Sequence, residues 1–171
     1  MKNKLNDNDI KKINIFLKDY SLYVDNIDLK NNILIKIKKD IFLISNELYK
    51  HLNEFNNNNV KFAGLYMGDI DGKFSPSFNF LDLICDKVKN KKTINKTKEF
   101  LFLCGRDLTD DSFSGKTDGR FLVLNNKGNI LGIVKKIKND KKQKNFTKIF
   151  FKNILDKGII LRREFTHRHR Q

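Results

Sequence analysis

The chain has few of the residues that cross-link or interrupt a polypeptide. Its 171 residues include two cysteines, one proline and no tryptophan. Cys85 and Cys104 stand apart without CxxC spacing, so we expect reduced thiols in an intracellular compartment rather than a disulfide framework. No apolar run approaches the roughly 18 residues of a membrane span, and the amino terminus lacks the apolar stretch of a signal peptide. We therefore expect a soluble intracellular protein with no membrane partner.

Sequence motifs of common enzyme classes are also missing. The chain has no P-loop and no GxGxxG, HExxH or GxSxG segment, which argues against these classes of nucleotide-binding and hydrolytic sites. His51 falls in a predicted helix, while His167 and His169 fall in an arginine-rich tail without Cys or carboxylate at ligand spacing. Such a histidine pair is a poor metal site. We expect no metal, no cofactor and no enzymatic activity.

Two acidic pairs keep one catalytic alternative open. Asp69 with Asp71, and Asp110 with Asp111, are the kind of residues that a small metal-dependent nuclease uses to hold a divalent ion. Both pairs fall in predicted turns, where Asp is favoured for backbone reasons alone. A nuclease is therefore the alternative from another functional class, and a structural protein whose charge only keeps it in solution is a third.

Positive charge is concentrated in the second half of the chain. Residues 1–90 have 14 Lys, no Arg and 12 acids, a net charge of +2, whereas residues 91–171 have 15 Lys, 6 Arg and 8 acids, a net charge of +13. Biased coding explains the lysines in both halves but not the confinement of every arginine to the second. This asymmetry is typical of a nucleic-acid-binding domain joined to a nearly neutral one. We place the domain boundary between Asn90 and Lys91.

The first half predicts a small α+β domain. Apolar residues at helical spacing predict helices over residues 9–20, with Asn8 or Asp9 as the cap, and over residues 77–88. Alternating residues predict a hairpin over 33–44, and Ser45 or Asn46 is expected to cap a helix that follows it. Residues 60–70 read as a buried strand, in which Gly64 and Gly68 indicate a bulge or a close backbone approach.

The second half predicts short strands and tight turns. A strand is expected at 93–97, a helix at 99–104 that ends at Gly105, and a hairpin formed by 121–124 and 130–137. A further strand is expected at 147–154, after a basic loop. Closely spaced short strands in about eighty residues are typical of a small barrel-like sheet. The predicted fold class is α+β, with an N-terminal α/β domain followed by a C-terminal β-barrel.

Basic side chains along the last strands form the candidate RNA-binding site. We expect them to gather on one surface, where six phosphate contacts to a single strand would give a log affinity against log salt slope of roughly −4. The two arginines among them can also stack on unpaired bases. The predicted residues are Lys135, Lys136, Lys138, Lys141, Lys142, Lys144, Lys148, Lys152, Arg162 and Arg163.

Several strings, in order along the chain, resemble one family. They are GLYMGDIDGKFSPSF at 64–78, FLFLCGRD at 100–107, FLVLNNKGNILG at 121–132, and KNILDKG at 152–158 with LRRE at 161–164. They look like the nuclear-import-protein-seven family of large ribosomal subunit biogenesis factors, and FLCGRD and ILDxGxxLRRE look closer to its archaeal branch. Members of this family pair a pre-PUA domain, here residues 1–90, with a C-terminal PUA RNA-binding domain, here 91–171 with a basic tail.

The resemblance implies a non-catalytic RNA-binding factor in large ribosomal subunit assembly and rRNA processing. The PUA half would contact pre-rRNA, preferring single-stranded or uridine-rich segments, and the pre-PUA half would contact other assembly proteins of the pre-ribosomal particle. An archaeal source would place the protein in the cytoplasm, and a eukaryotic source in the nucleolus or nucleus. The alternative within RNA biology is a targeting subunit for a separate RNA-modifying enzyme.

Overall fold

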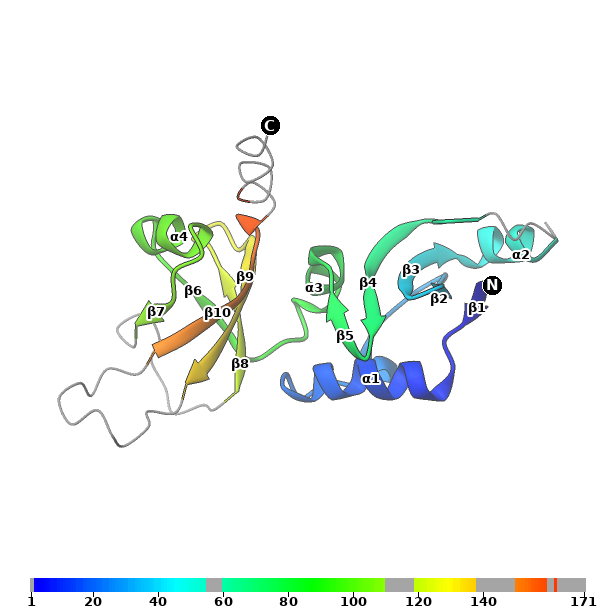
Figure 1. Ribbon diagram of the computed structural model, residues 1–171, viewed down its shortest axis with the longest axis horizontal. Helices are drawn as coiled ribbons and strands as arrows, with labels where there is room; N and C mark the ends of the chain where they lie inside the picture. Colours follow the sequence, from blue (N-terminus) through cyan, green and yellow to red (C-terminus); the bar gives the residue numbers. More distant parts are fainter. Residues whose placement is uncertain (1, 55–59, 110–118, 138–149, 160–161, 163–171) are drawn as a thin grey trace. The chain divides into compact units, whose positions relative to one another are not determined.

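The chain divides into two compact units, Met1–Lys87 and Val88–Gln171. A computed structural model (Figure 1) describes residues 2–54, 60–109, 119–137, 150–159 and 162. The step in charge after Asn90 lies just beyond the division between the units. Each unit has its own five-stranded sheet, and we describe each separately.

The N-terminal unit is built on an antiparallel sheet with strand order β1-β2-β3-β4-β5, so each strand lies beside its neighbours in the sequence. This order needs only short connections and places α1, α2 and α3 between or after strands. The strands are β1 (Lys2–Lys4), β2 (Asn32–Ile37), β3 (Asp40–Ser45), β4 (Leu65–Asp71) and β5 (Lys73–Pro76). The helices are α1 (Asp7–Lys18), the 3-10 turn Val24–Asn26, α2 (Asn46–Glu54) and α3 (Phe78–Ile84).

Both faces of this sheet are covered. On one face Ile35, Ile37, Phe42 and Ile44 form a buried cluster, against which Tyr49 of α2 packs. The other face is covered by α1, because Lys36, which alternates with these residues along β2, reaches Asp9 of that helix.

An aromatic cluster joins α1 to the end of the sheet. The ring of Phe16 lies 5.7 Å from that of Phe74 and 6.2 Å from that of Phe80, and the last two are 4.9 Å apart, all with edge-to-face geometry. Such pairs stabilise a core beyond the apolar area that they bury. They tie α1, β5 and α3 into one body.

Most predicted elements of this unit are present, with shifted ends. The first helix starts two residues earlier than predicted, and its cap is Asn6, whose side chain accepts from the Asp9 N–H at 2.8 Å, so the predicted caps were wrong. Ser45 caps α2, as expected, by accepting from Leu48 N–H. The strand β5 was not predicted, and α3 ends at Ile84 rather than at residue 88.

The two glycines of the predicted strand behave as expected. An added Cβ would lie 2.4 Å from the Leu43 carbonyl oxygen at Gly64 and 2.3 Å from that of Ser75 at Gly68. The pairing of β3 with β4 shifts register beside Gly68, which is the predicted bulge.

The C-terminal unit is a curled sheet of strand order β6-β8-β9-β10-β7, with α4 beside β10 (Figure 1). Only β6 pairs in parallel, with β8; the other pairs are antiparallel. The elements are β6 (Lys91–Thr93), α4 (Lys96–Leu103), β7 (Leu108–Thr109), β8 (Arg120–Leu124), β9 (Ile130–Ile137) and β10 (Phe150–Asp156).

Its core confirms the predicted barrel-like arrangement. Apolar side chains of β8 and β10 pack against one another, with the rings of Phe121 and Phe151 5.6 Å apart. The cluster consists of Ile94, Phe102, Leu108, Phe121, Val123, Leu131, Val134 and Phe151. The hairpin of β8 and β9 is present, and α4 stops just before Gly105, which adopts φ +84° as expected of a C-terminal stop. The first strand of this half lies at Lys91–Thr93, earlier than predicted.

Candidate nucleic-acid interface

Three basic residues lie directly opposite one another across the C-terminal sheet. In the pairing of β8 with β9, Arg120 is the partner of Lys135, and in the pairing of β9 with β10, Lys135 is the partner of Lys152. Directly opposed residues share a face, and their Cβ atoms lie about 4.5–5.5 Å apart. Lys135 and Lys152 are exposed and Arg120 is half-buried. We call these three residues the basic row.

The three charges of the basic row are all positive. Like charges directly opposite one another in a sheet destabilise it. An anion that lies across the three strands removes this repulsion, and phosphate oxygens accept the hydrogen bonds that Lys and Arg donate. The arrangement can therefore hold a polyanion backbone.

Two other predicted residues lie elsewhere. Lys136 pairs with the buried Phe151, so it belongs to the sheet face opposite Lys135. Arg162 follows β10, and its guanidinium donates to both carboxylate oxygens of Asp156, at 2.9 and 2.8 Å. The same guanidinium donates to the carbonyl oxygen of Leu103 at the end of α4. These hydrogen bonds with Asp156 raise the pKa of Arg162 above its usual value.

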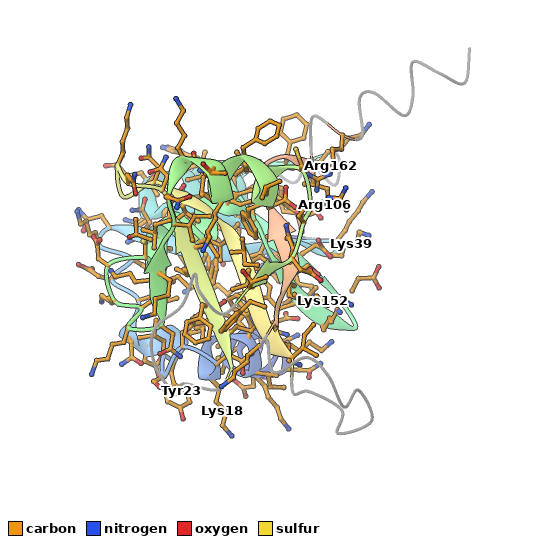
Figure 2. The ribbon with its side chains drawn as sticks, turned by 90° about the vertical axis from the view of Figure 1, so that its left-hand side faces the viewer. Lys18, Tyr23, Lys39, Arg106, Lys152 and Arg162 are labelled. Carbon is orange, nitrogen blue, oxygen red and sulfur yellow. The ribbon has the colours of Figure 1, made fainter. Side chains whose placement is uncertain are left out.

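Arg162 therefore has a structural role that the sequence did not predict. Asp156 is 3% exposed, and a buried carboxylate needs a paired cation or hydrogen bonds. Figure 2 shows Arg162 and Arg106 together at one end of the unit, with Lys152 farther along β10. RNA binding by Arg162 stays a prediction, and it would have to use the part of the guanidinium that Asp156 does not occupy.

The remaining predicted residues, Lys138, Lys141, Lys142, Lys144, Lys148 and Arg163, lie outside the described residues. The same holds for Asp110 and Asp111 of the nuclease alternative.

The other acidic pair is described: Asp71 forms an ion pair with Lys39 at 3.4 Å, and Asp69 accepts from the Tyr66 hydroxyl at 3.3 Å. Within the described ranges, no three His, Cys, Asp or Glu side chains gather to hold a metal ion. No helix in these ranges is long and apolar enough to cross a membrane.

Each half of the chain matches a known domain family. Residues 2–78 match the NIP7/UPF0113 pre-PUA domain, and residues 90–165 match the UPF0113 PUA domain. The chain belongs to the NIP7/UPF0113 family. The resemblance and the fold class that the sequence predicted are thereby confirmed. PUA domains are typically RNA-binding, so membership in this family suggests RNA binding and is consistent with a protein that is not an enzyme.

Two similar proteins from archaea differ from this chain at most positions. Over 136 residues, 76% of each protein, the chain is 27% identical to the UPF0113 protein of Archaeoglobus fulgidus. A solved structure of a conserved PUA domain protein from Thermoplasma acidophilum is similar with a TM-score of 0.47 and 16% identity, over 92% of this chain and 96% of that one.

Arg120 is the residue of the basic row that the sequence reading missed. The strand predicted at 121–124 does not include Arg120, whereas β8 begins with it. The pairing of β8 with β9 also shifts register between Val123 and Leu124. A hairpin extended without that shift would place Arg120 opposite Val134, not opposite Lys135. The available signal was the arginine next to the strand, but the shift decides its partner.

Proposed function

We propose that the protein is a non-catalytic RNA-binding factor in the assembly of the large ribosomal subunit, and that its PUA domain contacts pre-rRNA through the basic row. The observation that carries this proposal is the opposition of Arg120, Lys135 and Lys152 on one face of the sheet. The net charge of +13 in residues 91–171 supports it, because such a field attracts a polyanion before contact.

The proposed ligand is single-stranded or uridine-rich pre-rRNA, and the proposed setting is a pre-ribosomal particle with other assembly proteins. The sequence strings support this setting, because they resemble those of large-subunit assembly factors. The proposed compartment follows the source, namely the cytoplasm of an archaeon or the nucleolus of a eukaryote.

The first experiment measures RNA binding by the basic row. Fluorescence anisotropy with a labelled ten-nucleotide uridine RNA is recorded for the wild type and for the Lys135→Ala/Lys152→Ala variant between 50 and 200 mM salt. Each lost phosphate contact to a single strand reduces the steepness of log affinity against log salt by about 0.7, so the variant should lose about 1.4. Affinity should fall together with this slope.

A charge-matched variant separates contact from general attraction. Lys96→Ala/Lys127→Ala removes two exposed lysines, one on α4 and one in the hairpin turn, and lowers the net charge by the same amount. It should keep most of the slope. Equal losses in the two variants would reject the basic row as the RNA site, and no binding by the wild type would reject RNA binding itself.

The second experiment tests the assembly role. Crosslinking in cells that express the tagged chain, followed by sequencing of the attached RNA, should give reads clustered on large-subunit rRNA precursors. A cluster on transfer RNA or messenger RNA instead would remove the ribosome from the proposal and leave RNA binding intact.

A further inference from the structure

A polar pocket of about 310 Å³ lies in the N-terminal unit, where the edge strand β1 meets β2 and the start of α1. This volume is at the lower end of the range for small-ligand sites, about 300–1,000 Å³. The residues that line it come from two segments that are apart in sequence: Asn3, Lys4, Asn6 and Asp9 from the first, and Lys36 and Lys38 from the second.

Lys36 is fixed in the pocket by an ion pair. Its ammonium donates to Asp9 Oδ1 at 2.5 Å, and the side chain of Asp9 is 3% exposed. An ammonium carries three N–H donors, of which this hydrogen bond uses one. Asp9 therefore orients the ammonium, and Lys36 neutralises the carboxylate that would otherwise repel an anion.

Of the two other lysines in the lining, only Lys38 adds its charge on the side of the Lys36–Asp9 pair. Lys4 lines the pocket from β1, but it is the partner of Ile35, so its ammonium lies on the other face of the sheet, 5.5 Å from the centre of the Tyr49 ring. Lys38 lies in the turn between β2 and β3 with φ +58°. On the pocket's side, Lys36 and Lys38 against the one carboxylate of Asp9 leave a net charge of +1.

The asparagines supply neutral donors beside these charges. Asn3 is the partner of Lys36 in the pairing of β1 with β2, so both belong to one face at this edge. Asn6 caps α1 through its side-chain oxygen, which leaves its NH₂ group as the end that can donate to a ligand. Ammonium and amide donors from several directions suit the oxygens of a tetrahedral anion better than a planar carboxylate.

We propose that this pocket binds a phosphate group. The phosphate is either a backbone phosphate of single-stranded RNA or a free phosphate or nucleotide, because the lysine and asparagine donors recognise the same oxygens in each. In the first case both the N-terminal unit and the PUA domain bind RNA. This case rests on the proposed function. In the second case the pocket works independently of RNA.

The test uses the full chain labelled with ¹⁵N and follows backbone amide shifts in three titrations. The probes are inorganic phosphate, the ten-nucleotide uridine RNA, and sodium chloride at matched ionic strength. Phosphate should shift the amides of Asn3, Lys4, Asn6 and Lys38, and sodium chloride should not. If RNA shifts them at a lower concentration than phosphate, the source is RNA; if only phosphate shifts them, the source is a free anion.

Neighbouring lysines provide a matched pair of variants. Lys38→Ala should weaken the response to phosphate by about threefold, the effect of an exposed charge pair. Lys39→Ala changes the adjacent exposed lysine, which pairs with Asp71 and does not line the pocket, and it should leave the response unchanged. Lys36 is not used for the test, because its loss would leave Asp9 buried without its partner.

The inference is overturned if phosphate and RNA both leave these amides where sodium chloride leaves them, or if the two variants respond equally. Its failure is distinct from that of the proposed function. RNA that shifts only the amides of β8, β9 and β10 rejects the pocket and supports the basic row. Phosphate that shifts the pocket in a protein that binds no RNA does the reverse.

Discussion

Arg162 holds the buried carboxylate of Asp156 through two hydrogen bonds, of 2.9 and 2.8 Å, one to each oxygen. Because Arg162 also donates to the Leu103 carbonyl oxygen, it joins the end of β10 to the end of α4. Leu103 of the string FLFLCGRD, Asp156 of ILDKG and Arg162 of LRRE thus meet in space. Their residue types serve the packing of the PUA domain as well as any contact with RNA.

Replacing Arg162 should destabilise the protein more than replacing the exposed Arg106 nearby. Arg162→Ala leaves the Asp156 carboxylate buried without its cation, whereas Arg106→Ala removes a solvated side chain. Arg162→Lys should fall between the two, since an ammonium cannot donate to both oxygens in the planar two-bond geometry. Urea unfolding gives the three midpoints. Equal midpoints for Arg162→Ala and Arg106→Ala would show that the pairing adds nothing to stability.

Gly158 lies in the same contact and leaves no room for a side chain. A Cβ there would be 1.9 Å from the carbonyl oxygen of Leu103 and 2.8 Å from Nη1 of Arg162. Backbone would have to move, so we expect Gly158→Ala to lower the free energy of unfolding by about 3 kcal/mol, at the upper end for overpacking. Urea denaturation measures this change directly.

Gly128 is the matched control for this substitution. It lies in the β8–β9 turn with φ +81°, and a Cβ there has nothing within 4 Å. Gly128→Ala should therefore cost only the strain of the left-handed conformation, roughly 1–2 kcal/mol. If it costs as much as Gly158→Ala, the close approach to Leu103 does not explain the need for glycine.

Local patterns predicted most elements of the fold because each has its own signal. The β2–β3 hairpin follows from alternating isoleucines, and Gly105 marks the end of α4 by adopting φ +84°. The strand β5 was missed for an equally local reason. Lys73–Pro76 contains proline, which disfavours a strand, but as the last strand of its sheet it is at an edge, where proline is tolerated.

The candidate site was less predictable because it depends on register. Arg120 opposes Lys135 only because the pairing shifts by one residue between Val123 and Leu124. A further shift between Asn153 and Leu155 changes the pairing of β10 with β9 beyond Lys152. A one-residue slip moves every side chain to the other face of the sheet, and composition carries no record of it. The structural role of Arg162 could not be predicted from the sequence either, because it depends on the burial of Asp156.

The second bulge has a side-chain partner that can be tested. At the shift in β10, the backbone N–H of Asn153 donates to Asp107 Oδ1 at 2.8 Å. Asp107→Ala removes this acceptor and should lower the free energy of unfolding by about 1–2 kcal/mol. Asp107→Asn keeps an oxygen in the same place and should lose less than half of that. Urea unfolding of both variants decides the matter, and equal losses would mean that the carboxylate charge matters rather than the hydrogen bond.

Tyr66 should ionise at an unusually high pH. Partial burial, together with the carboxylates of Asp69 and Asp40, which oppose the phenolate, raises the pKa of Tyr66 to about 12. In the unfolded chain a tyrosine ionises near pH 10. Between about pH 10 and 12 the folded protein therefore holds a proton that the unfolded chain has lost. The contribution of Tyr66 to the free energy of unfolding is therefore fully present below pH 10, and it decreases as the pH rises toward 12.

The titration can be assigned with two variants. The difference in phenolate absorbance between the wild type and Tyr66→Phe should rise with a midpoint of about pH 12. Asp69→Asn removes the negative charge beside the Tyr66 hydroxyl, so it should lower that midpoint. A midpoint near 10 in the wild type would show that neither burial nor the carboxylates act on this phenol.

The basic row should trade stability against RNA binding, and Arg120 is the residue at which to measure both. Arg120→Met keeps a long apolar side chain at this half-buried position but removes the charge opposite Lys135. The free energy of unfolding should stay within about 1 kcal/mol, because the repulsion between like cross-strand charges that is lost is worth a fraction of that. The steepness of log RNA affinity against log salt should nevertheless fall by about 0.7, one phosphate contact. Urea unfolding and anisotropy on the same preparation give the two numbers.

Arg120→Lys serves as the control that keeps the charge, and it should retain the slope. A variant that loses stability but keeps the slope would make Arg120 a packing residue and reduce the row to Lys135 and Lys152.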